Sequence, residues 1–261
     1  MKALVLAAGL GERVRPLTEK IPKPMLEVGG RPLIHYPMAM LRRAGVTEVA
    51  INVHHLADSI QRSLRNGNSI GMAITYSPEP VLFGTGGPLN ALTGYLGDST
   101  FVIANSDSIV DLDLTAMIAF HRDRGALTTV ALHGLGHPPE YGHLEIDREG
   151  RMRRMRLLRT RNPIAFDDYP PELRGIDESA LSSYMYCGVI VAEPAVFELM
   201  PKSPPWGLMT GLIAPMVASG LPVLGFVHDG YFRTVDDLSG YESLRREFET
   251  SPPNFRNLDL V

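Results

Sequence analysis

Two cationic side chains and a pair of glycines lie close together near the start of the chain. The sequence G-L-G-E-R occupies residues 9–13, and Lys23 stands between two prolines. Glycines at the end of a strand let backbone N–H groups approach a polyphosphate, and arginine and lysine supply the opposing charge. The pattern therefore predicts a phosphate site built from Gly9, Gly11, Arg13 and Lys23, with Arg15 as a weaker candidate.

A carboxylate that could hold a divalent cation occurs farther along the chain. Asp107 directly follows the apolar run 101–104. Ligands bind at the carboxyl ends of strands in an open parallel sheet, where a carboxylate can reach a cation that bridges phosphates. For Asp107, the competing interpretation is a helix or turn cap, because Asp and Ser favour such positions.

A glycine-rich loop offers a third set of groups. The sequence G-T-G-G at residues 84–87 lies between a predicted strand and a short helix. Glycines at this density let the backbone approach a flat ligand, so that N–H and C=O groups can read the edge of a base. Alone, such a loop would be interpreted as a plain turn.

The elements that must position these groups alternate between strand and helix through residues 1–132, which predicts a parallel sheet with crossover helices. Pro37 is expected to kink the first helix. The predicted strands are 3–8, 48–53, 72–76, 101–104 and 127–132, and the predicted helices are 31–45, 58–64 and 115–124.

The pattern changes after residue 133. An antiparallel hairpin is predicted over 144–158, with its turn at 147–150, followed by a long excursion over 160–180. The sequence then predicts strands at 183–192 and 223–227, helices at 194–200, 208–218 and 238–248, and a loose tail from residue 251. The fold class is α/β, a three-layer core with a β-rich insertion in the second half.

Composition indicates an ordinary enzyme of the cytoplasm. The formal net charge of −4 over 261 residues offers no general surface for nucleic acid or a membrane. A single cysteine, Cys187, excludes an internal disulfide and suits a reducing compartment. The apolar run at the N-terminus stops at Gly9, so we interpret it as a first core strand rather than a signal peptide.

The opening string G-x-G-x-R, followed by P-L-T and K-P, resembles the signature of the sugar-1-phosphate nucleotidyltransferases. The segments G-T-G-G-P-L (84–89) and N-S-D (105–107) are similar to those of mannose-1-phosphate guanylyltransferases. The resemblance implies a Rossmann-like fold with a mixed, mostly parallel sheet. It also implies one domain over 1–250, with a nucleotide-binding half (1–133) and a sugar-binding half (134–250), followed by a flexible tail (251–261).

The resemblance also implies roles for individual residues. Arg13, Lys23 and Asp107 would be catalytic, with Asp107 holding Mg²⁺. Strict spacing puts Thr234 at the second metal position, whereas a two-residue offset puts Asp236 there. We favour Asp236, and Asp237 stays open. The nucleotide-binding residues would be Ala8, Gly9, Gly11, Arg13, Gly84, Thr85, Gly86, Gly87 and Asn105.

The sugar-binding half departs from the family pattern. Tyr141-Gly142 resembles the family's Y-G pair, but the E-K-P segment that should follow is missing. Arg159 or Arg161 could replace its lysine, although a solvated arginine-rich hairpin explains them equally well. Tyr-Cys-Gly over 186–188 occupies the position of the family's N-x-G segment, so the asparagine that contacts the sugar in the family is absent here. The predicted sugar-binding residues are Tyr141, Gly142, Arg159 and Gly188.

The function that follows is transfer of a nucleoside monophosphate from an NTP to a sugar 1-phosphate, giving an NDP-sugar and pyrophosphate. Guanylyl transfer to a mannose- or heptose-type sugar phosphate is the favoured version, and uridylyl, thymidylyl and cytidylyl transfer are alternatives. A non-catalytic homologue that binds NDP-sugar and regulates a partner is the rival class. Arg13, Lys23 and Asp107 together favour the enzyme. A homodimer is compatible with the resemblance.

Overall fold

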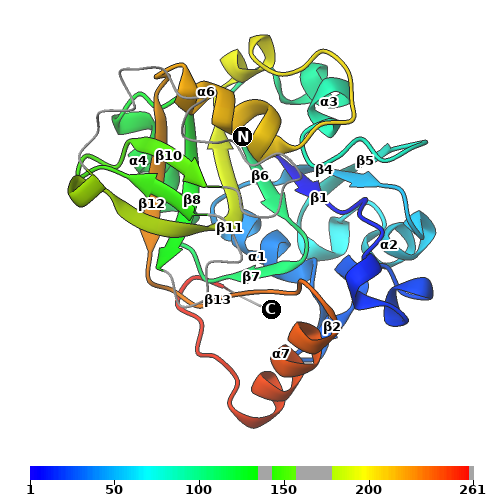
Figure 1. Ribbon diagram of the computed structural model, residues 1–261. Coiled ribbons are helices and arrows are strands. Elements are labelled where there is room, and N and C mark those ends of the chain that lie inside the picture. The colour runs from blue at the N-terminus through cyan, green and yellow to red at the C-terminus, as the bar shows by residue number, and fades with distance from the viewer. Residues whose placement is uncertain (135–142, 157–177, 259–261) are drawn as a thin grey trace.

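The computed structural model describes residues 1–134, 143–156 and 178–258. Within these ranges, nine strands form one mixed sheet (Figure 1). Seven of them follow one path, and β8 pairs with β11 of that path and with β12. The strands are β1 (Lys2–Leu6), β4 (Glu48–Val53), β5 (Ala73–Pro78), β6 (Phe101–Asn105), β8 (Thr128–Gly134), β9 (His143–Ile146), β10 (Met152–Arg156), β11 (Ser182–Ala192) and β12 (Val223–His228). The order along the main path is β10-β9-β11-β6-β1-β4-β5.

The first half of the sheet is parallel and the second is mainly antiparallel. β1 pairs in parallel with β4 and β6, and β4 does so with β5, so their carboxyl ends share one edge. β11 runs antiparallel to β6, β8 and β9, whereas β12 is parallel to β8. The predicted hairpin is confirmed as β9 and β10, which pair antiparallel.

Helices cover both faces of the sheet, which gives the three predicted layers. Successive residues of β1 point to opposite faces, so Ala3 and Val5 enter one hydrophobic cluster and Leu4 enters the other. The first cluster contains residues of α1 (His35–Arg43), α2 (Ala57–Leu64), α4 (Leu114–Asp123) and α7 (Leu238–Thr250). The second contains residues of α3 (Pro88–Leu96), a π-helix (Met209–Ile213) and α6 (Ala214–Ala218).

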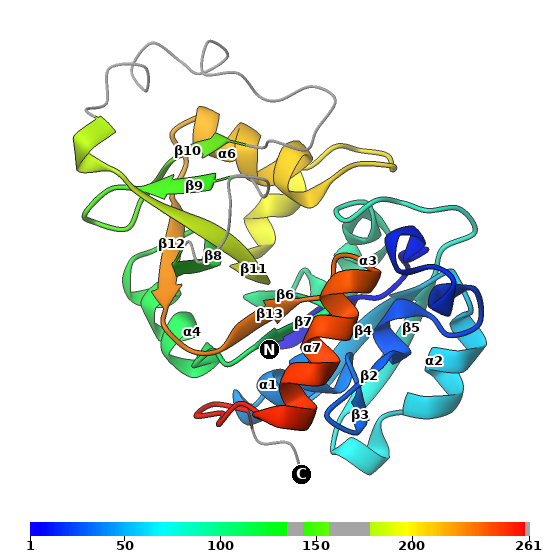
Figure 2. The same ribbon diagram turned by 60° about the horizontal axis from the view of Figure 1, so that its bottom comes forward.

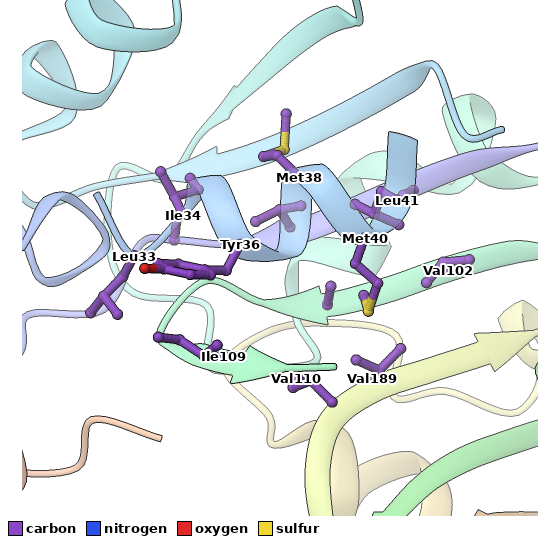
Figure 3. Packing of buried hydrophobic residues seen from close by; sticks show 14 of the residues in the cluster. Leu33, Ile34, Tyr36, Met38, Met40, Leu41, Val102, Ile109, Val110 and Val189 are labelled. Atoms are coloured by element: carbon purple, nitrogen blue, oxygen red, sulfur yellow. The ribbon is translucent and has the colours of Figure 1, made fainter. Parts of the chain in front are cut away.

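Close packing under α1 joins the two halves of the chain. Figure 3 shows Met40 of α1 beside Val102 of β6 and close to Val189 of β11. All three side chains are at most 2% exposed. Because β6 and β11 pair directly, one continuous core supports both the parallel and the antiparallel strands.

The start of the first helix differs from the prediction. Residues Arg31–Pro32 form the short strand β3, which pairs with β2 (Glu27–Val28), and α1 begins only at His35. Pro37 therefore lies in the first turn of α1, where backbone N–H groups have no partner within the helix. For this reason the proline does not have to kink the helix.

Besides β2 and β3, two further strands escaped the sequence prediction. β7 (Ser108–Val110) pairs antiparallel with β13 (Phe232–Thr234), and both views place them side by side (Figures 1 and 2). This pairing carries the segment before α7 to the residues that follow β6. Figure 2 also shows α7 lying along β2.

Part of the chain after α7, residues 255–258, is packed rather than loose. Phe255 makes edge contacts with Tyr36 and Tyr231, at centroid distances of 6.1 and 5.6 Å. The backbone N–H groups of Arg256 and Asn257 donate hydrogen bonds of 2.8 and 2.6 Å to the Asp111 carboxylate. The expectation of a loose tail is therefore wrong for these residues. No described helix combines the length and apolar composition that a membrane span requires.

Candidate active site

One glycine and one hydroxyl shape the loop after β1. Gly11 has a φ of +64°, and a Cβ added there would lie 2.8 Å from Thr18 Cγ2 and 3.2 Å from Lys23 Cβ. The Thr18 hydroxyl donates a hydrogen bond of 2.8 Å to the Gly11 carbonyl. Since a side chain at Gly11 would be strained in this conformation and crowded by its neighbours, the glycine allows the loop to close beside Lys23.

Lys23 reaches from this loop to Asp107. A single turn of 3-10 helix, Lys23–Met25, starts after Pro22 and has Pro24 in its first turn. The Lys23 ammonium lies 2.6 Å from Asp107 Oδ2, and the two side chains are only 13% and 29% exposed. A cation and a carboxylate that are 84 positions apart in the sequence thus form one ion pair.

Asp107 lies at the carboxyl edge of the parallel strands, as predicted. β6 ends at Asn105 beside the end of β1, and the Ser106 N–H donates a 3.3 Å hydrogen bond to the Leu6 carbonyl. The Ser108 hydroxyl donates to Asp107 Oδ1 at 3.3 Å. The hydrogen bonds found for the Asp107 carboxylate in the described part of the chain come from side chains, so it does not cap a helix there.

The three C-terminal candidates have different environments. The Thr234 hydroxyl lies 3.2 Å from the hydroxyl of Ser108, its partner in the β7–β13 register. Asp236 lies 3.4 Å from the Arg13 guanidinium, and the Asp237 carboxylate caps α7 by accepting from the Gly240 N–H at 2.8 Å. Because the Val235 N–H also donates to the Asp107 carbonyl at 3.0 Å, this segment runs beside Asp107.

A pocket of about 240 Å³ opens where these segments meet. Seven of the predicted site residues line it, whereas Gly11, Arg13, Gly86, Gly87, Gly188 and Asp236 do not belong to its lining. The predicted residues that the pocket brings together are Ala8, Gly9, Lys23, Gly84, Thr85, Asn105 and Asp107.

Sequence reasoning missed two polar residues of the pocket, Asn52 and Glu79. The Asn52 amide accepts from the Ala7 N–H at 2.8 Å and donates to Glu79 Oε1 at 2.7 Å. Glu79 Oε2 accepts from the Phe83 N–H at 2.7 Å, and the glutamate is only 4% exposed. Both residues lie at the carboxyl ends of β4 and β5, so the rule that singled out Asp107 could have identified them.

The glycine-rich loop is divided between the pocket and the protein interior. Gly84 and Thr85 are exposed and line the pocket. A Cβ on Gly86 would lie 2.1 Å from the Trp206 ring, and a Cβ on Gly87 would lie 2.1 Å from the Phe83 carbonyl. These last two glycines are therefore required by packing, and their contact with a base stays a prediction.

Of the predicted sugar-binding residues, only Gly188 lies within the described part of the chain. Tyr141, Gly142 and Arg159 lie outside the described residues, as does Arg161. Gly188 has a φ of +83°, and a Cβ there would approach the Asn105 side chain to 3.0 Å.

The neighbours of Gly188 on β11 are buried. The Tyr186 hydroxyl is buried, and it has no hydrogen-bond partner among the described residues. Burial raises the pKa of Tyr186 and of the Cys187 thiol, so both side chains are neutral near pH 7.

The carboxylates fit a magnesium ion that also binds substrate oxygens. No cluster of three or more His, Cys, Asp or Glu suitable for a metal occurs in the described ranges. Mg²⁺ usually takes one or two protein carboxylates and completes its octahedron with waters and phosphate oxygens. Asp107 and Asp236, which come from segments that lie side by side and keep 29% and 22% of their side-chain surface exposed, match that requirement.

Comparison with known proteins gives a consistent result. The family described as nucleotidyl transferase matches residues 2–156. The chain is 32% identical over 237 residues to a UTP–glucose-1-phosphate uridylyltransferase of Synechocystis, a match that covers 85% of this chain and 56% of that protein. It is also 32% identical over 208 residues to a mannose-1-phosphate guanyltransferase of Candida albicans, covering 78% and 53% of the two chains.

Solved structures resemble the fold over nearly the whole chain. A Bacillus anthracis protein assigned as a glucose-1-phosphate thymidylyltransferase superimposes with a TM-score of 0.78 at 19% identity, covering 96% of each chain. The chain spans little more than half the length of the two relatives that are similar in sequence.

Proposed function

The chain belongs to the nucleotidyl transferase family, and on that premise we propose that it transfers a nucleoside monophosphate from an NTP to a sugar 1-phosphate. The products are an NDP-sugar and pyrophosphate. The observation that carries the proposal is the pocket at the ends of β1 and β6, where Lys23 and Asp107 form a partly buried pair. A cation and a carboxylate beside exposed backbone suit a reaction between two phosphate groups.

The reaction depends on positioning and charge neutralisation rather than on a nucleophilic side chain. A sugar phosphate already carries anionic oxygen at neutral pH, because its second pKa is about 6. That oxygen forms the new bond to the α-phosphorus, and the bond to the bridging oxygen breaks as pyrophosphate leaves with the electron pair. Lys23 and Arg13 place positive charge beside these oxygens and lower the repulsion between the two substrates.

We propose Mg²⁺ as the divalent metal, since members of this family generally use one. Asp107 and Asp236 would hold it, and when bound it would neutralise charge on the phosphates. Lys23 and Arg13 contact these same carboxylates, so both cations lie near the expected phosphates.

For the base, we propose guanine. The Glu79 carboxylate is buried in the pocket, and a carboxylate only accepts hydrogen bonds. Guanine offers an imino and an amino N–H side by side, whereas uracil and thymine offer one N–H between two carbonyl groups. The uridylyltransferase relative keeps uridylyl transfer as the alternative, together with thymidylyl and cytidylyl transfer.

For the sugar, we propose a mannose- or heptose-type 1-phosphate, in accord with the guanyltransferase relative. We further propose that residues 1–133 bind the nucleotide and that residues 134–250 bind the sugar within one domain. A regulatory homologue that binds NDP-sugar without turnover remains the rival function.

A matrix of NTPs and sugar 1-phosphates, assayed for pyrophosphate release with Mg²⁺, tests the proposal. We expect release only when both substrates are present, and most rapidly with GTP and mannose 1-phosphate among the pairs tried. Release with UTP but not GTP would keep the reaction and overturn the base. NDP-sugar binding without release from any pair would favour the regulatory homologue.

A further inference from the structure

The only tryptophan of the chain, Trp206, lies against the loop that lines the nucleotide pocket. Its backbone N–H donates to the Phe83 carbonyl at 3.1 Å, and its carbonyl accepts from the Gly86 N–H at 3.0 Å. These two bonds tie residue 206 to both sides of Gly84 and Thr85, which line the pocket. A residue in the second half of the chain is thus hydrogen-bonded to a loop in the first half.

Side chains extend this contact on both sides. The Trp206 indole N–H donates to Asn90 Oδ1 at 2.8 Å, and the Asn90 amide donates to the Pro201 carbonyl at 2.8 Å. The Leu208 N–H donates to the Thr85 hydroxyl at 2.9 Å. The start of α3 and the glycine-rich loop are therefore both anchored to residues 201–208.

The glycines of the loop fit this contact closely. A Cβ on Gly84, whose φ is +76°, would lie 2.4 Å from the Trp206 carbonyl oxygen. A Cβ on Gly86 would lie 2.1 Å from the indole ring, and one on Gly211 would lie 2.9 Å from it. Since Trp206 is only 8% exposed, its ring occupies the space that side chains at residues 86 and 211 would need.

We propose that Trp206 is a positioning residue for nucleotide binding: it holds Gly84 and Thr85 in place against the NTP and does not itself touch either substrate. The inference rests on the proposed nucleotide site and adds the residue that sets the loop's position. It also makes Trp206 an intrinsic reporter, because a nucleotide that contacts the loop acts on a segment that is hydrogen-bonded to the Trp206 backbone and packed against the indole ring at Gly86.

Fluorescence titration of the whole protein tests this without turnover. We expect GTP or UTP, added with Mg²⁺, to change the tryptophan emission in a saturable way, and mannose 1-phosphate alone to leave it unchanged. Asn90→Leu removes the indole acceptor and should raise the nucleotide Kd about ten- to a hundredfold, as expected for a small displacement of a binding group. Asn90→Asp keeps an acceptor oxygen for the indole but loses the amide that donates to Pro201, so it should restore only part of the affinity.

Kinetics separate positioning from simple destabilisation. Trp206→Leu should raise the KM for the NTP at least about tenfold while the KM for the sugar phosphate changes little. Phe197→Leu is the matched control, because Phe197 is buried in the same cluster but stacks on Phe101 instead of the loop. Equal effects of both variants on both KM values would overturn the proposal.

Failure of this inference can be told from failure of the proposed function. If the protein binds nucleotides with no transferase activity, the fluorescence titration and the Asn90 pair still decide the role of Trp206. Should Trp206→Leu not fold, the Asn90 variants carry the test alone. Unchanged nucleotide affinity in Asn90→Leu, with folding confirmed by circular dichroism, would contradict the proposal.

Discussion

The two ion pairs of the site differ in how much solvent they keep. Lys23 and Asp107 are 13% and 29% exposed, whereas Arg13 is 56% exposed beside Asp236. An exposed pair contributes about 0–1 kcal/mol, but a more buried charge that loses its partner is costlier. Arg13 can therefore leave Asp236 for a phosphate at little cost, while Lys23 is held in place.

Lys23→Ala should lower kcat/KM about ten- to a hundredfold for every pair of substrates, because a charge-assisted contact to phosphate contributes about 1.5–3 kcal/mol. Lys20→Ala is the control, since Lys20 is exposed on the same loop. Steady-state pyrophosphate release measures both variants. Normal activity of Lys23→Ala with every sugar phosphate would favour the regulatory homologue.

Asp236→Ala and Asp237→Ala should fail in different ways. Asp236→Ala should lower turnover by orders of magnitude and raise the Mg²⁺ concentration needed for half-maximal rate, because it removes a proposed metal ligand. Asp237→Ala removes the cap of α7 and should cost about 1 kcal/mol of stability with little change in turnover. Thermal melts and Mg²⁺ titrations distinguish them, and the reverse pattern would reassign the metal ligand.

At the scale of elements, what the sequence could predict depended on length and periodicity. The long strands and most helices carry apolar runs or helical spacing, so β4 was predicted with its observed bounds. β7 and β13 have three residues each, too few for a period, and their pairing joins Ser108 to Thr234. That pairing brings the segment containing Asp236 beside Asp107, which spacing alone left open.

The residues of the site also fall into those that the sequence could predict and those that it could not. Gly11, Lys23 and Asp107 stand in local motifs whose chemistry can be recognised before folding. Glu79 and Asn52 stand at the ends of predicted strands, so position could have singled them out, but their mutual hydrogen bond is not visible in the sequence. Trp206 owes its position to contacts with the loop at 84–87, a distant segment, and single-sequence patterns contain no record of such contacts.

The β8–β11–β12 region contains a pH-sensitive buried group. His228 on β12 contacts the Cys187 thiol at 3.4 Å, and burial, followed by the charge of His133, lowers the pKa of His228 to about 4. As the pH falls below 6.5, His228 takes up a proton in the unfolded chain, where its pKa is 6.5, but stays neutral in the folded protein until the pH approaches 4. Stability from this group is present above pH 6.5 and is lost as the pH falls toward 4.

Urea unfolding at several pH values checks this. We expect the free energy of unfolding to fall by up to about 3 kcal/mol between pH 6.5 and 4 on account of His228. His228→Gln should reduce the slope against pH by about one proton over the same interval. An unchanged slope in this variant would assign the acid sensitivity to other groups.

At the scale of the whole molecule, one sheet carries both halves of the chain. β6 pairs with β1 on one side and β11 on the other, so the strand that precedes Asp107 lies at the junction. The loop at 84–87 and residues 201–208 join the halves a second time. At such a junction, each half of the chain can bind one of the two substrates, as the proposed division between nucleotide and sugar requires.

The fate of the α-phosphate tests the central claim most directly. GTP radiolabelled at the α-phosphate is incubated with the protein, mannose 1-phosphate and Mg²⁺, alongside the same experiment with labelled UTP and with the Asp107→Asn variant. We predict that the label moves into a phosphatase-resistant sugar nucleotide in step with unlabelled pyrophosphate, and that Asp107→Asn abolishes this transfer while remaining folded. Label that stays in free nucleotide with every sugar phosphate offered would contradict nucleotidyl transfer by this chain.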